Sequence, residues 1–125
     1  MFDHLSIGVA DLGRSKTFYD AALRPLGVTC LHESDSALGY GSVRPMLWML
    51  RVERPVPSDP ESGLHLCFAA PSEDAVAEFH RAAMLAEGRD NGMPGLRPDY
   101  GPGYFAAFAL DPDGYRIEVL HQAQP

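Results

Sequence analysis

Two histidines and one glutamate are the residues of this chain whose types and positions could do chemistry together. His4 and His65 each open one of two similar segments, and Glu118 stands in an otherwise apolar stretch, Tyr115–Leu120. Two imidazoles and one carboxylate bind divalent metals and leave positions open for water or substrate. A carboxylate on the inward face of such a strand is costly unless it is paired or metal-bound. The residues therefore predict a metal site.

An internal repeat relates the two histidines. A shift of 61 residues gives six identities over positions 4–27 without a gap, where ordinary composition would give roughly one or two. The matches are His4-Leu5 with His65-Leu66, Phe18 with Phe79, Ala21-Ala22 with Ala82-Ala83, and Gly27 with Gly88. Pseudo-twofold packing of the two copies would bring the equivalent strands, and with them the histidines, toward one cleft.

Each copy predicts a strand and then a helix that ends at a glycine. In the first copy, residues 2–9 are strand-like and Asp11 is the expected N-cap of a helix over Leu12–Leu23. In the second copy, a strand over Leu64–Ala69 precedes a helix that is capped by Ser72 and closed at Gly88.

Short strands follow each helix. In the first half we expect them at 28–32, 38–41 and 46–52; in the second half, a hairpin at 104–110 and 115–120 turns through Asp111-Pro-Asp-Gly114. The Gly- and Pro-rich segment 89–103 predicts a long loop. Each half then reads β-α-β-β-β. The 125 residues form one domain, with a first module at about 1–53, a proline-rich linker at about 54–62 and a second module at about 63–125.

Several stretches together resemble the vicinal oxygen chelate superfamily, which includes glyoxalase I, bleomycin resistance proteins, fosfomycin-modifying enzymes and extradiol dioxygenases. They are Phe2–Ile7, Phe18-Tyr19, Leu26-Gly27, Gly63–Leu66, Phe79-His80 and, most specifically, Leu110–Glu118. The resemblance implies an α+β fold in which two paired βαβββ modules form a cupped mixed sheet around a metal-binding cleft. It also assigns His4, His65 and Glu118 as the metal ligands.

One position departs from the glyoxalase I pattern. Glyoxalase I usually has a fourth protein ligand, a carboxylate on the last strand of the first module, where this chain reads Met46-Leu-Trp-Met-Leu50, and Glu53 lies just beyond. Standard glyoxalase chemistry is therefore in doubt. The remaining triad is closer to the dioxygenase and fosfomycin-enzyme pattern. Zn, Mn, Fe, Ni and Co all accept this ligand set, so the sequence leaves the metal open.

The resemblance implies a small metal-dependent enzyme. It would chelate two oxygens of a small oxygen-rich substrate and carry out lyase, isomerase or transferase chemistry. One alternative is an Fe(II) extradiol-type dioxygenase. Another is a metal-free protein of bleomycin-resistance type that sequesters a drug or metabolite, for which the net charge of −7 would suit a cationic ligand.

Other residues could serve the same cleft. Glu118 could act as a catalytic base by leaving the metal, and Arg97 could hold a substrate carboxylate or phosphate through its planar fork. Tyr100 and Tyr104 could donate hydrogen bonds from the predicted loop. Trp48 could shape a pocket, although a place in the core is the favoured expectation. Cys67 shares a strand face with His65, and a buried thiol without a role is expected there.

Composition limits the partners. Ten Lys and Arg residues against 17 Asp and Glu residues argue against nucleic acid and anionic membranes. No apolar run approaches the ~20 residues of a transmembrane helix, and no signal peptide is visible. Cys30 and Cys67 fit a reducing cytosol, so a cytoplasmic enzyme with a small-molecule substrate is expected. The resemblance implies a homodimer, and His4 could complete the site of its own chain or of a partner.

Overall fold

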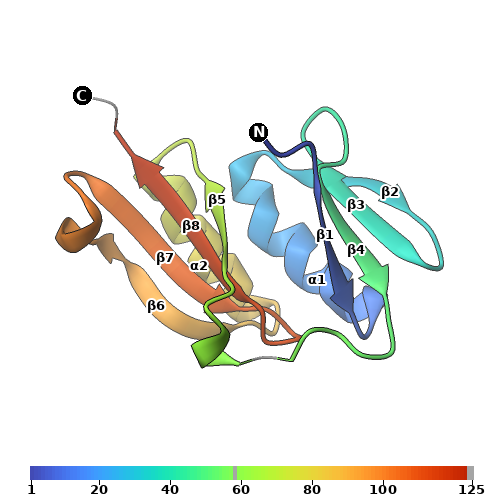
Figure 1. Ribbon diagram of the computed structural model, residues 1–125. Coiled ribbons are helices and arrows are strands. Elements are labelled where there is room, and N and C mark those ends of the chain that lie inside the picture. The colour runs from blue at the N-terminus through green and yellow to red at the C-terminus, as the bar shows by residue number, and fades with distance from the viewer. Residues whose placement is uncertain (58, 124–125) are drawn as a thin grey trace.

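The chain forms two four-stranded mixed sheets of the same topology, each with one helix (Figure 1). The computed structural model describes residues 1–57 and 59–123. The first sheet has the order β1-β4-β3-β2 and the second β5-β8-β7-β6, and in both the first strand runs parallel to the last. The first sheet comprises β1 (Leu5–Val9), β2 (Thr29–Glu33), β3 (Ala37–Gly41) and β4 (Leu47–Arg51). The second comprises β5 (Leu66–Ala69), β6 (Arg89–Leu96), β7 (Tyr104–Leu110) and β8 (Arg116–Gln122). The predicted α+β fold of paired βαβββ modules is confirmed.

Both helices begin at the predicted caps. The Asp11 side chain accepts a hydrogen bond from the Arg14 amide at the start of α1 (Leu12–Leu23), and Ser72 accepts one from the Ala75 amide at the start of α2 (Glu73–Leu85). Single-turn 3₁₀ helices lie at Arg24–Leu26 (η1), Pro60–Ser62 (η2) and Pro98–Tyr100 (η3). No helix within the described residues is long and apolar enough to cross a membrane.

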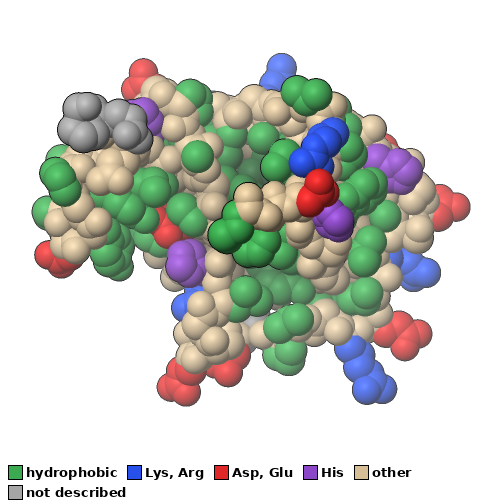
Figure 2. Space-filling view, turned by 45° about the horizontal axis from the view of Figure 1, so that its top comes forward, with side chains coloured by type: hydrophobic (Ala, Val, Ile, Leu, Met, Phe, Trp, Pro, Cys, Tyr) green, Lys and Arg blue, Asp and Glu red, His purple; other side chains and the backbone are tan. Residues whose placement is uncertain are grey.

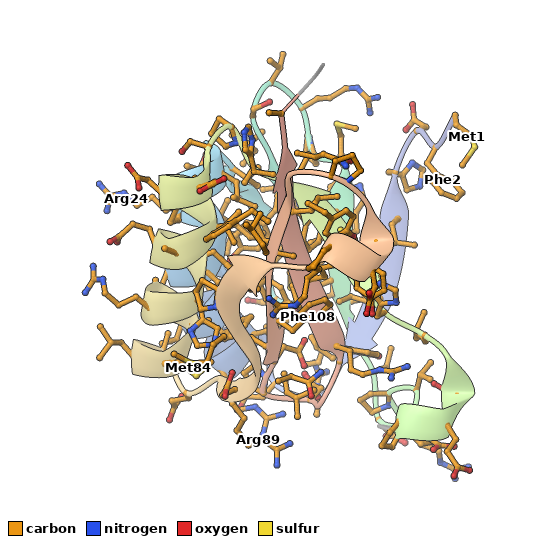
Figure 3. The ribbon with its side chains drawn as sticks, turned by 90° about the vertical axis from the view of Figure 1, so that its left-hand side faces the viewer. Met1, Phe2, Arg24, Met84, Arg89 and Phe108 are labelled. Carbon is orange, nitrogen blue, oxygen red and sulfur yellow. The ribbon has the colours of Figure 1, made fainter. Side chains whose placement is uncertain are left out.

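The two α-helices share one layer, and within the described residues no α-helix covers the opposite faces of the two sheets (Figure 3). In Figure 3 the helices stand together on one side of the strands, and the η3 turn and the N-terminus lie on the other. The alternation of buried and more exposed residues at the start of β4 fits this arrangement, because alternate residues of a strand point to opposite faces of the sheet. The core between helices and sheets contains fully buried large side chains, namely Phe18, Tyr19, Leu23, Leu38, Tyr40, Met49, Val76, Phe79, Ile117 and Val119.

The predicted long loop at 89–103 is wrong over its first half, which is the edge strand β6. Its irregular pairing with β7 includes shifts around Gly92. Gly92 has a φ of 152°, and a Cβ there would lie 2.8 Å from Cδ1 of Phe108. Pro94 is tolerated because β6 is an edge strand, where a missing amide donor need not break a ladder. Glycine and proline thus mark bulges here rather than a loop.

The Asp111–Gly114 turn does more than connect β7 to β8. The Asp113 carboxylate accepts hydrogen bonds from the Ala10 amide at 3.1 Å and from Arg14 at 3.2 Å, both in the first module. The Tyr115 hydroxyl donates to the carbonyl of Gly8 at 2.6 Å. The turn therefore joins the second module to the start of α1 in the first. We call Asp111–Tyr115, with these contacts, the clasp.

Candidate functional site

A cavity of about 630 Å³ lies on the open face of the second sheet. Tyr104, Phe108 and Glu118 point into it, whereas their strand neighbours Ala107 and Val119 point into the core. Figure 2 shows hydrophobic side chains gathered around hollows, with isolated charged groups between them. The residues that line the cavity are His65, Asn91, Gly92, Arg97, Tyr100, Tyr104, Phe108, Arg116 and Glu118.

His65 and Glu118 meet in this cavity. Nε2 of His65 lies 3.1 Å from Oε1 of Glu118, and the Tyr104 hydroxyl donates to Oε2 at 2.6 Å. The Glu118 side chain is 5% exposed and His65 is 48% exposed, so the imidazole is open to solvent while the carboxylate is buried. Both carboxylate oxygens have partners, which offsets the cost of burying the charge.

The Tyr104 phenol remains a donor. Burial, followed by its hydrogen bond to the Glu118 carboxylate, raises the pKa of Tyr104 well above its ordinary value. The phenol is consequently protonated at neutral pH and can hold Glu118 in a fixed orientation.

Cys67 lies opposite Glu118 in the β5–β8 pairing. Its side chain is exposed on the open face, so the expectation of a buried thiol is wrong. Partial desolvation of the sulfur, followed by the nearby Glu118 carboxylate, raises the pKa of Cys67 to about 12. Without a bound metal the residue is therefore a neutral thiol and not a thiolate nucleophile.

His4 does not join this pair within the chain. It precedes β1 as His65 precedes β5, but β1 and β5 belong to different sheets. His4 is exposed, and its Nδ1 lies 2.8 Å from Oδ1 of Asp3. Across residues 1–57 and 59–123, no group of three or more His, Cys, Asp or Glu side chains is placed to hold a metal. An imidazole nitrogen and a carboxylate oxygen at 3.1 Å fit part of a divalent-metal site, which needs at least one further ligand.

Trp48 occupies in the first sheet the place that Glu118 occupies in the second. Ser6 pairs with Trp48 in the β1–β4 ladder, as Cys67 pairs with Glu118 in the β5–β8 ladder. Strand β4 therefore has no carboxylate at this position, and Glu53 lies beyond its end.

The expectation that Trp48 lies in the core is wrong. Leu47 and Met49 on either side are buried, and the partly exposed indole lies on the opposite face. It packs over Gly39, with its ring 5.3 Å from that of His32. Trp48 does not line the cavity of the second sheet.

The structure brings Arg97, Tyr100 and Tyr104 to the same cavity, together with Asn91 and Arg116, which sequence reasoning missed. Arg116 could have been found, because it stands two residues before Glu118 and so shares its strand face. Asn91 could not, because the bulges in β6 decide which of its side chains face the cavity.

This fold, with a histidine and a carboxylate on the open face of a βαβββ module, is the vicinal oxygen chelate fold. The chain belongs to the Glyoxalase/Bleomycin resistance protein/Dioxygenase superfamily, whose family model matches residues 1–119. No curated protein matches the chain.

Solved structures agree with this assignment. A glyoxalase/bleomycin resistance protein from Albidiferax ferrireducens T118 is 32% identical, with a TM-score of 0.84 over 98% of this chain and 99% of that one. A glyoxalase-related enzyme from Fulvimarina pelagi is 20% identical, with a TM-score of 0.76 over 97% and 87%. Lactoylglutathione lyase from Agrobacterium tumefaciens is 19% identical, with a TM-score of 0.64 over 97% and 92%. The last two share the fold.

Proposed function

We propose that this domain, residues 1–125, is a small divalent-metal-dependent enzyme that acts on an oxygen-rich small molecule by lyase, isomerase or transferase chemistry. One observation carries the proposal: Nε2 of His65 and Oε1 of Glu118 lie 3.1 Å apart in a cavity large enough for a small substrate. A bound divalent cation would chelate vicinal oxygens of the substrate and stabilise negative charge on them.

The chain's own residues have distinct tasks in this proposal. His65 and Glu118 hold the metal, and Tyr104 orients Glu118 through its 2.6 Å hydrogen bond. Glu118 could also take a proton from the substrate if it left the metal. His4 is the third ligand, and a second copy of the chain supplies it in a homodimer, because His4 of the same chain does not join the pair. The two free cysteines support a cytoplasmic location.

The first test is metal content. Elemental analysis of untagged protein should find near-stoichiometric Zn, Mn, Fe, Ni or Co in the wild type, and His65→Ala should lose it. Removing one of three ligands lowers metal affinity strongly, because a divalent site needs its full ligand set. His121→Gln is the control, since His121 contacts the carbonyl of Ala70 and does not line the cavity. Absence of metal after reconstitution with each ion would overturn the proposal.

A metal-free binding protein is the second candidate. It is favoured by the finding that the described residues of one chain do not gather three metal ligands. In that case His65→Ala should leave ligand binding nearly intact, whereas under the enzyme proposal it should abolish metal retention.

A further inference from the structure

The cavity on the second sheet carries two arginines in a chain whose net charge is −7. Arg97 precedes η3, and Arg116 begins β8. Within the described residues neither guanidinium forms an ion pair with a carboxylate, although three other arginines do. The cavity's own carboxylate, Glu118, is engaged by a histidine and a tyrosine. The lining is thus locally cationic within an acidic protein.

The Arg97 guanidinium is held in place before any ligand arrives. Its Nη2 donates to the carbonyl of Met93 at 2.7 Å, and its Cζ lies 5.4 Å from the ring centre of Phe108, which adds a cation–π contact. Gly95 leaves room for it, because a Cβ there would lie 3.1 Å from Nη1 of Arg97. A fixed guanidinium loses less conformational entropy when it binds a ligand.

Arg116 is anchored in a similar way. Its Nε donates to the carbonyl of Leu64 at 3.1 Å. A guanidinium has five N–H donors, so both arginines keep donors for a ligand. Asn91 and Tyr100 add polar groups at the exposed margin of the cavity.

We propose that the cavity binds an oxyanionic group of the substrate, a carboxylate or a phosphate, through Arg97 and Arg116. The planar guanidinium fork matches the oxygens of both groups, and the cavity lining holds two guanidinium groups and one carboxylate, that of Glu118. The inference rests on the proposed function, in which His65 and Glu118 serve the reacting oxygens of the same molecule. It assigns an anionic ligand, in contrast to the cationic ligand that the net charge suggests.

Calorimetric titration tests this on the protein stripped of metal and on the protein reconstituted with it. The probes are phenylphosphonate, benzoate and inorganic phosphate, which separate phosphate from carboxylate binding, and benzylammonium is the cationic counterpart. At least one oxyanion should bind and benzylammonium should not. Arg97→Gln and Arg116→Gln should each weaken oxyanion binding about tenfold or more, because a charged hydrogen-bonding partner is lost.

Arg24→Gln is the matched control. Arg24 is an exposed arginine in η1, on the helix side of the molecule in Figure 3, away from the face that carries Phe108. Its substitution should leave binding unchanged. Wild-type affinity should also fall as NaCl is raised, a measurement that depends on no variant. Failure of every oxyanion to bind in either form, benzylammonium binding instead, or unchanged affinity in both glutamine variants would overturn the proposal.

Metal content separates this inference from the proposed function. Arg97→Gln and Arg116→Gln should retain metal, whereas His65→Ala should lose metal and retain oxyanion binding to the metal-free form. A protein that binds oxyanions but no metal would refute the enzyme and leave the oxyanion site standing. A protein that holds metal but binds no oxyanion would refute the oxyanion site and leave the proposed enzyme standing.

Discussion

At the residue scale, the buried carboxylates Glu118 and Asp111 have different roles in this structure. Glu118 is buried in the cavity, with His65 and Tyr104 on its oxygens. Asp111 is 1% exposed in the clasp, where its side chain accepts hydrogen bonds from the Tyr19 hydroxyl and from the amides of Asp113 and Tyr115. Burial nevertheless dominates and raises the pKa of Asp111 to about 6. Asp111 therefore makes stability depend on pH in the opposite sense to a salt-bridged carboxylate.

Asp111→Asn should remove that dependence. Because the folded pKa of about 6 exceeds the unfolded value of about 3.9, the aspartate stabilises fully below pH 4 and loses this contribution as pH rises through 6. The free energy of unfolding of Asp111→Asn, relative to wild type, should rise by about 2 kcal/mol between pH 4 and pH 7, given the pKa of about 6. Urea titrations across this range measure it. A difference that is constant with pH would contradict the assignment.

At the element scale, the β7–β8 turn and the edge strand β6 shape the molecule. The turn reaches the first module through Asp113 and Tyr115, so a local Asp-Pro-Asp-Gly motif also fixes how the modules meet. Strand β6 supplies Asn91 and Gly92 to the cavity and leads directly into Arg97. Its bulges, and the close packing of Phe108 on Gly92, position that arginine beside the pocket.

Asp113→Ala should weaken the clasp. The Asp113 side chain is 4% exposed, and its loss leaves the Ala10 amide without its acceptor and Arg14 without its ion pair. The free energy of unfolding should fall by about 1–3 kcal/mol. Asp35→Ala, at an exposed turn residue, is the control and should change stability little. Equal stability of the two variants in urea would show that the clasp contributes nothing.

At the scale of the whole molecule, the open faces of the two modules occupy equivalent places in the fold but carry different residues. The second has His65 and Glu118, and the first has His4 with Trp48 in the place of the carboxylate. Neither face by itself gathers three ligands within the described residues. A dimer in which the first module of one chain faces the second module of the other would complete the proposed site.

Mixing two inactive variants tests this arrangement. Chains carrying His4→Ala and chains carrying His65→Ala should each bind no metal alone. After joint refolding, a mixed dimer should regain one of its two sites, because one partner still supplies His4 and the other still supplies His65 and Glu118. Elemental analysis of the isolated mixed dimer measures this. If the mixed dimer recovers no metal, the partner's His4 does not complete the site, and the proposed dimer arrangement is wrong.

The sequence by itself was enough to predict the strands and helix of the first module, the caps at Asp11 and Ser72 and the β7–β8 hairpin. These features depend on local periodicity, capping and turn chemistry. It was not enough for β6, because glycine and proline in a bulged edge strand look like a loop.

Only the tertiary structure decided which candidates meet. It placed Glu118 beside His65 and Tyr104, left His4 apart on the other sheet, and turned Trp48 away from the core. The reason is physical: strand register and the placement of two sheets depend on contacts between residues far apart in the chain, which no local pattern encodes.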